Sequence, residues 1–143
     1  MSSVTHAYQQ AAVSSADSVQ LVIMMHEMMI DDLRRCLSAI HARDIQRRTR
    51  EAGHALMVLE QLQSSLNLEH GGEAVRTLDR VYAGARVELL RAQANKDPAL
   101  LEQQIAIFSS LRDAWRKVGS QRVQADDLSD PGLEAFARQA WSV

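Results

Sequence analysis

Cysteine, proline and aromatic residues are scarce in this sequence, which has one cysteine, two prolines and 4% aromatic residues among 143 residues. A single thiol, Cys36, cannot form an internal disulfide, so we expect a reducing, cytoplasmic location. Alanine, leucine, glutamate, glutamine and arginine are abundant instead. Because these residues favour helices and little proline interrupts them, the composition predicts an all-α protein.

An excess of charge and a long apolar run are also absent. The net charge is −2 and the pI is near 6.2, so we expect no nucleic-acid partner. The longest apolar run, residues 21–25, is too short to span a bilayer, and we expect no membrane insertion. Residues 1–16 lack the charged and apolar regions of a signal peptide.

Apolar residues recur with helical spacing over residues 17–42, 44–67, 72–95 and 98–118. Between the second and third of these stretches, Gly71 and Gly72 form a structural corner, because glycine takes a positive φ without penalty. Short connections make successive helices run antiparallel. The pattern therefore predicts an antiparallel up-down four-helix bundle.

The ends of the chain differ from this bundle. Residues 1–16 have weak periodicity and predict an N-terminal arm, and residues 17–119 form the bundle. Gly119 and Ser120 end the fourth helix, and residues 120–143 form a polar linker and a short extra C-terminal amphipathic helix. That helix docks on its own bundle, on a second copy or on a partner, and the sequence leaves the three open.

The sequence contains no complete catalytic or metal-binding pattern. Glu51 and His54 form one Glu-x-x-His pair, but a di-iron bundle needs a second pair and two further glutamates. We expect both side chains to be solvated. Cys36 lies among apolar residues with no adjacent base, which is typical of a buried, inert thiol. We therefore expect no metal, no cofactor and no enzymatic activity, with a metal-binding bundle as the weaker alternative.

Several interior positions are assigned from the helical pattern. Met25, Met28 and Met29 belong to the core of the first helix. Gly53 lowers helix propensity by about 1 kcal/mol relative to alanine, which predicts close packing against a neighbouring helix.

Some apolar residues lie outside the predicted core stripes, and we expect them to be exposed. If they are contiguous, they form a groove for an apolar helical segment of another protein. They are Ile23, Met24, Ile30, Met57, Val58, Val87 and Ile107.

The stretch SLNLEHGGEAVRTLDRVY, followed by ARVELLRAQANKDP and LRDAW, resembles the flagellar secretion chaperone family FliS. The matching elements are the run at residues 65–67, the glycine corner with Glu73, the Leu78-to-Tyr82 stripe and residues 111–115. Tyr8 and QLVIMMHE resemble the start of the family, although His26 stands where the family often has tyrosine.

The resemblance implies a cytoplasmic chaperone that binds the disordered C-terminal segment of flagellin, prevents its premature polymerisation and aids flagellar type III export. The export gate and other flagellar regulators are further candidate partners. The resemblance also implies that the arm with Tyr8 covers part of the groove until flagellin displaces it, whereas from the sequence alone Tyr8 could equally pack the arm onto the bundle. A helical regulator that dimerises through its C-terminal helix, as a weak homodimer, is the alternative to a monomeric chaperone.

Overall fold

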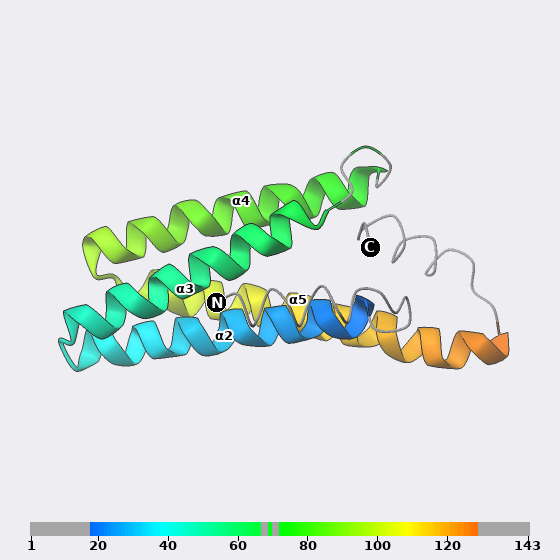
Figure 1. Ribbon diagram of the computed structural model, residues 1–143, viewed down its shortest axis with the longest axis horizontal. Coiled ribbons are helices and arrows are strands. Elements are labelled where there is room, and N and C mark those ends of the chain that lie inside the picture. Colours follow the sequence, from blue (N-terminus) through cyan, green and yellow to red (C-terminus); the bar gives the residue numbers. More distant parts are fainter. Residues whose placement is uncertain (1–17, 67–68, 70–71, 129–143) are drawn as a thin grey trace.

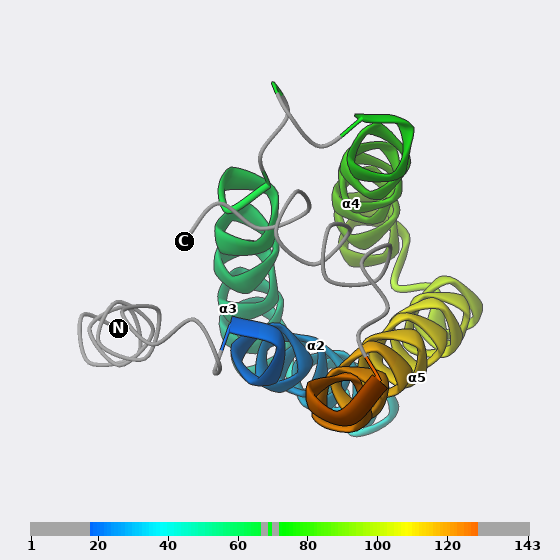
Figure 2. The ribbon, with the colours of Figure 1, turned by 90° about the vertical axis from the view of Figure 1, so that its right-hand side faces the viewer.

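The computed structural model describes residues 18–66, 69 and 72–128. Their helices are α2 (Ser18–His41), α3 (Ile45–Ser64), α4 (Gly72–Asn95) and α5 (Pro98–Leu128). Successive helices run in alternating directions (Figure 1). Each helix packs against two others, in the cyclic order α2, α3, α4, α5 (Figure 2). The predicted all-α, antiparallel up-down four-helix bundle is confirmed.

The ends of the helices follow the local signals in the sequence. Asp44 precedes α3 and its carboxylate accepts the Arg47 amide at 3.1 Å, and Asp97 accepts the Ala99 amide at 3.0 Å before α5. Gly72 opens α4 with φ +66°, as predicted for the glycine corner, whereas Gly71 lies outside the described residues. The predicted starts of α3, α4 and α5 therefore agree with the structure to within one residue.

The predicted end of the fourth helix was wrong, because α5 continues through Gly119 and Ser120 to Leu128. Gly119 is buried, and a Cβ there would lie 3.4 Å from Cγ1 of Val19 in α2. The glycine therefore lets α5 pass close to α2 instead of ending the helix. The first part of the predicted linker, residues 120–128, is therefore helical. The predicted arm, the rest of the linker and the C-terminal helix lie outside the described residues.

The core is filled from all four helices. Its largest fully buried side chains include Met29 and Leu33 of α2, Leu59 of α3, Tyr82 of α4 and Phe108 of α5. Met25 is buried and Met28 is packed against the core, so the assignment of these methionines to the interior is confirmed.

Three residues that we expected to be exposed belong to this core. Ile23 is 7%, Ile30 1% and Val58 6% exposed. A helix that packs against two neighbours buries a wider arc than one stripe of apolar residues, and these side chains lie on the widened arc. The prediction that they contribute to a surface groove was therefore wrong.

His26 links three helices inside the core. Its Nδ1–H donates to the Val22 carbonyl at 2.7 Å, which leaves Nε2 to accept the Tyr82 hydroxyl at 3.0 Å. The Trp115 side chain of α5 hydrogen-bonds Tyr82 in turn. Burial lowers the pKa of His26 to about 4, so the ring is neutral at neutral pH.

Candidate functional site

The described surface carries six large apolar side chains that are at least 40% exposed. Val87 and Leu90 lie on α4, Met24 on α2 and Ile107 on α5, and α3 contributes Ile45 and Met57. Exposure of Met24, Met57, Val87 and Ile107 was predicted. The exposure of Leu90 and Ile45 was not predicted.

Leu90 faces the neighbouring helix α3 and is nevertheless 51% exposed. At 100° per residue, Leu90 lies about 20° around α4 from Asp79 and about 40° from Arg86. Both of these side chains bond Gln63 of α3, at 3.2 and 3.3 Å. The boundary between α3 and α4 is therefore open near Leu90.

We call this open boundary the α3–α4 seam and define it by Ile45, Leu56 and Leu90. Leu56 is half-buried on α3. Val87 lies about 80° around α4 from Asp79, on the solvent face opposite the buried residues, and neighbours Leu90 one turn away. Gln63 of α3 bonds both Asp79 and Arg86, so it lies level with the part of α4 between them. Because α3 and α4 are antiparallel, residues 55 and 56 of α3 then lie level with Leu90. Polar bonds close the seam at the Gln63 level and leave apolar side chains along the rest of it.

Met24, Met57 and Ile107 are not part of the seam. Ile107 lies about 180° around α5 from Arg116, whose guanidinium bonds Glu27 of α2 at 2.7 Å, so it faces away from α2. Met57 lies about 120° around α3 from Gln63, toward solvent. Among the predicted groove residues that the structure describes, Val87 lies next to the seam and the others lie away from it. Tyr8 lies outside the described residues.

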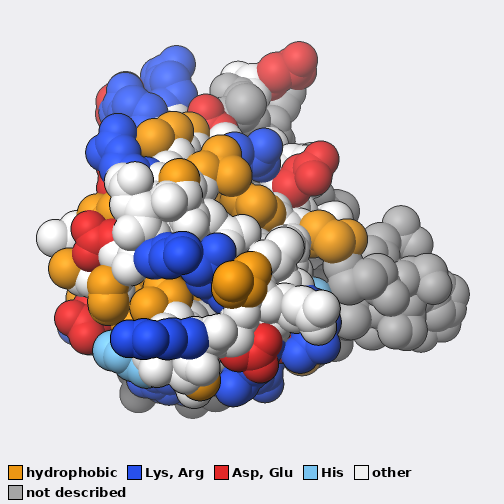
Figure 3. Space-filling model, turned by 90° about the vertical axis from the view of Figure 1, so that its left-hand side faces the viewer, with side chains coloured by type: hydrophobic (Ala, Val, Ile, Leu, Met, Phe, Trp, Pro, Cys, Tyr) orange, Lys and Arg blue, Asp and Glu red, His pale blue; other side chains and the backbone are white. Residues whose placement is uncertain are grey.

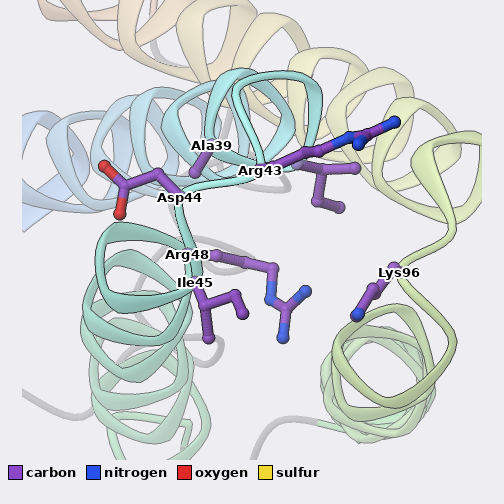
Figure 4. Close-up of a pocket in the computed structure, with 7 residues that line it drawn as sticks. Ala39, Arg43, Asp44, Ile45, Arg48 and Lys96 are labelled. Carbon is purple, nitrogen blue, oxygen red and sulfur yellow. The ribbon is translucent and has the colours of Figure 1, made fainter.

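One end of the seam widens into a cavity of about 430 Å³ where the α2–α3 and α4–α5 corners meet. Arg48, Ile45 and Lys96 extend into the space between α3 and α4, whereas the Asp44 carboxylate points away from it (Figure 4). Viewed from this end, basic and hydrophobic side chains are intermixed on the surface (Figure 3).

Asp32 and His54 form a buried polar contact between α2 and α3, and the sequence pattern missed it. Nδ1 of His54 lies 2.5 Å from Oδ2 of Asp32, whose side chain is only 2% exposed. Burial raises the pKa of Asp32, and the hydrogen bond from His54 partly opposes this shift. The expectation that His54 is solvated was wrong, because an acid placed inside α2 gave no local signal of its partner 22 residues away.

The remaining candidate chemistry is structural. Burial, with a smaller effect from the Asp32 charge, raises the pKa of Cys36 to about 12, so the thiol is not a nucleophile near neutral pH. Within the described ranges, no three His, Cys, Asp or Glu side chains are grouped to hold a metal ion. No described helix is long and apolar enough to cross a membrane.

Comparison with known proteins identifies the family. The family model described as "Flagellar protein FliS" matches residues 1–122. This chain belongs to the FliS family.

Named relatives of this FliS-family chain are flagellar secretion chaperones. It is 27% identical to FliS of Vibrio cholerae over 116 residues, which cover 78% of this chain and 85% of the relative. It is 27% identical to FliSB of Pseudomonas aeruginosa, covering 76% of this chain and 89% of the relative. For FliS of Escherichia coli the identity is 28%, over 79% of this chain and 87% of the relative.

Proposed function

We propose that this protein is a cytoplasmic chaperone that binds the disordered C-terminal segment of flagellin, prevents its premature polymerisation and aids flagellar type III export. Membership of the FliS family and the names of its relatives support a role in flagellar secretion. The observation that supports binding of an apolar segment is the α3–α4 seam, where Leu90 faces a neighbouring helix and stays half exposed.

The physical basis of the proposal is burial of apolar surface without a chemical cycle. A disordered segment that orders on the bundle loses conformational entropy, and the seam offsets this loss by burying apolar side chains of both proteins. Binding removes the free segment from polymerisation by mass action alone. The mechanism therefore requires no nucleotide and no cofactor.

Titration calorimetry with a purified flagellin C-terminal peptide tests the proposal. We expect saturable binding, and we expect the double variant Val87→Ser, Leu90→Ser to weaken it about tenfold, because two half-exposed apolar contacts are lost. Met24→Ser is the matched control, since Met24 is equally exposed but lies on α2. Thermal unfolding of each variant verifies that the bundle is intact.

The possible results separate the function from its location. Absence of binding to the intact protein would refute the flagellin-chaperone function. If Met24→Ser weakened binding as much as the double variant, the function would stand and the assignment of the seam as its main site would be wrong.

A further inference from the structure

The cavity at the end of the seam is lined by three basic side chains, and none of them has an anionic partner among the described residues. Arg43, Arg48 and Lys96 make no side-chain hydrogen bond or ion pair within the part of the chain that the structure describes. Nε of Arg48 is buried and has no hydrogen-bond partner there. The chain as a whole has a net charge of −2, so this concentration of positive charge is local.

Capping of the helix ends does not account for these basic residues. The last carbonyls of α2 already accept backbone amides, since Arg43 N–H bonds Ile40 at 3.1 Å and Asp44 N–H bonds Ala39 at 2.9 Å. At the end of α4, Asp97 N–H likewise bonds Ala92 at 3.2 Å. These carbonyls are satisfied without the side chains of Arg43 and Lys96.

The helix dipole explains Arg48 even less well. Arg48 lies in the first turn of α3, where a positive charge is unfavourable and an acidic residue is preferred. This end of the bundle carries the starts of α3 and α5 and the ends of α2 and α4, so their dipoles largely cancel. The field in the cavity is therefore set by its side chains.

At both corners a basic residue also occupies a backbone position where glycine would be less strained. Arg43 has φ +56° and Lys96 has φ +52°, and both corners line the cavity. Glycine or asparagine is the usual residue in this left-handed conformation. A basic side chain thus occupies the turning position of each corner.

Apart from Asp44, the rest of the lining is aliphatic. Ala39, Ile40 and Ile45 surround the basic groups, and Ile45 is 59% exposed. A ligand that fits must combine a negative group with an apolar body. Asp44 does not neutralise the cavity, because its carboxylate caps α3 and points away.

We propose that this cavity binds an acidic segment of a partner protein, with a carboxylate between Arg48 and Lys96 and an adjacent aliphatic side chain against Ile40 and Ile45. Charge complementarity selects the carboxylate, and the cavity volume of about 430 Å³ is within the usual range for ligand sites. The proposal does not require the segment to come from flagellin.

The test adds a capped peptide of repeating Leu-Glu-Ala to the full-length, isotope-labelled protein. Binding is measured by nuclear magnetic resonance from the chemical shifts of the backbone amides. We expect saturable shifts of the backbone amides of Ile45, Arg48 and Lys96, which weaken as salt is added. The same peptide with glutamine in place of glutamate should bind at least tenfold more weakly. Sodium acetate and inorganic phosphate are titrated separately as small anions.

Two variants address the residues directly. Arg48→Gln removes the charge and keeps a good helix former, and Lys96→Asn removes the charge with a residue that tolerates positive φ. Each should weaken binding of the acidic peptide at least fivefold. Arg50→Gln is the control, because its side chain is 72% exposed on the same helix and lies outside the cavity lining.

The proposal would be overturned by shifts that fall outside the cavity, by equal binding of the glutamine peptide, or by equal loss of affinity in Arg50→Gln. Acetate or phosphate binding as tightly as the peptide would also overturn it, because the site would then be one for small anions. Because flagellin binding is measured with variants of Val87 and Leu90, failure of this proposal is distinguishable from failure of the chaperone function.

Discussion

His26 is a titratable residue placed in the centre of an apolar core. Both ring nitrogens are bonded, to the Val22 carbonyl and to the Tyr82 hydroxyl, and this arrangement holds only while the ring is neutral. The Tyr82 and Phe108 rings lie next to His26 and to each other, with centroids 5.9 and 5.8 Å from that of His26 and 6.3 Å apart. Protonation would place an unpartnered charge among them.

The free energy of unfolding should therefore fall as the pH is lowered from about 6.5 towards 4. In this window the unfolded chain binds a proton at His26 and the folded chain does not, because burial lowers the folded pKa to about 4. The loss should be about 1.4 kcal/mol per pH unit at most, measured by urea unfolding. Asp32, with its raised pKa, acts in the opposite direction, since its contribution to stability is lost as the pH rises through that pKa.

His26→Gln isolates the effect of the histidine, because glutamine can bond the same groups and does not titrate. The difference in unfolding free energy between the wild type and the His26→Gln variant should become smaller as the pH is lowered from 7 to 4. A constant difference across this range would show that His26 does not control the acid sensitivity of the fold.

Two glycines illustrate opposite backbone constraints. Gly53 lies inside α3, and a Cβ there would meet nothing within 4 Å, so the prediction of close packing at this position was wrong. Gly72 has φ +66°, which an L-residue adopts only with strain.

Gly53→Ala should raise the unfolding free energy by about 1 kcal/mol, because alanine is the better helix former and has room. Gly72→Ala should lower it by about 1 kcal/mol, because alanine is strained at positive φ. Chemical denaturation of both variants beside the wild type gives the comparison. Two changes of the same sign would contradict the conformations assigned here.

At the scale of the elements, the Asp32–His54 bond joins α2 to α3 beside a second link, in which the Cys36 thiol approaches the Arg48 carbonyl at 3.8 Å. Arg35 also contacts Asp32, at 3.3 Å on the same helix. A buried acid that bonds across two helices is satisfied in one register only. This contact therefore selects one alignment of α2 and α3 among those that their apolar faces would permit.

Removal of either partner should destabilise the bundle, and a double-mutant cycle should show coupling. We expect His54→Ala to cost about 2 kcal/mol, because it leaves a buried carboxylate without its cross-helix partner. The coupling energy with Asp32→Ala should be about 1 kcal/mol or more. His41→Ala, an exposed histidine at the end of α2, serves as the control. Additive effects in the cycle would mean that the contact contributes nothing specific.

At the scale of the whole molecule, the four helices bury one continuous core and leave apolar side chains on separate sides. The seam between α3 and α4 joins some of them and ends in the basic cavity, while Met24 and Ile107 stay apart from it. We infer that the N-terminal arm predicted over residues 1–16 competes with flagellin for this apolar surface.

Deletion of residues 1–16 should tighten binding of the flagellin C-terminal peptide several-fold, because the arm no longer competes for the apolar surface. Calorimetry on the full-length and shortened proteins measures the change, with Tyr8→Ala as a point variant of the same contact. Unchanged affinity would count against competition by the arm. Weaker affinity would indicate that Tyr8 itself contacts flagellin.

The starts of the described helices and their antiparallel order were predictable because they depend on local signals. Apolar spacing, the Asp44 and Asp97 caps and the glycine corner act within a few residues of one another. The same local reasoning was wrong for Gly119, whose role depends on the approach of Val19 from a distant helix.

The tertiary structure decided which side chains are exposed and which residues they contact, because both depend on which neighbouring helix covers each face of a helix. Ile23, Ile30 and Val58 are covered by second neighbours, whereas Leu90 and Ile45 are left open at the boundary of α3 and α4. The hydrogen bond between His54 and Asp32 likewise joins residues far apart in the chain, and Arg48 and Lys96 line the same cavity although they lie in different parts of the sequence. Helical periodicity identifies the main apolar face of a single helix. Which neighbours, if any, cover the remaining faces of that helix is determined only by the packing of the helices.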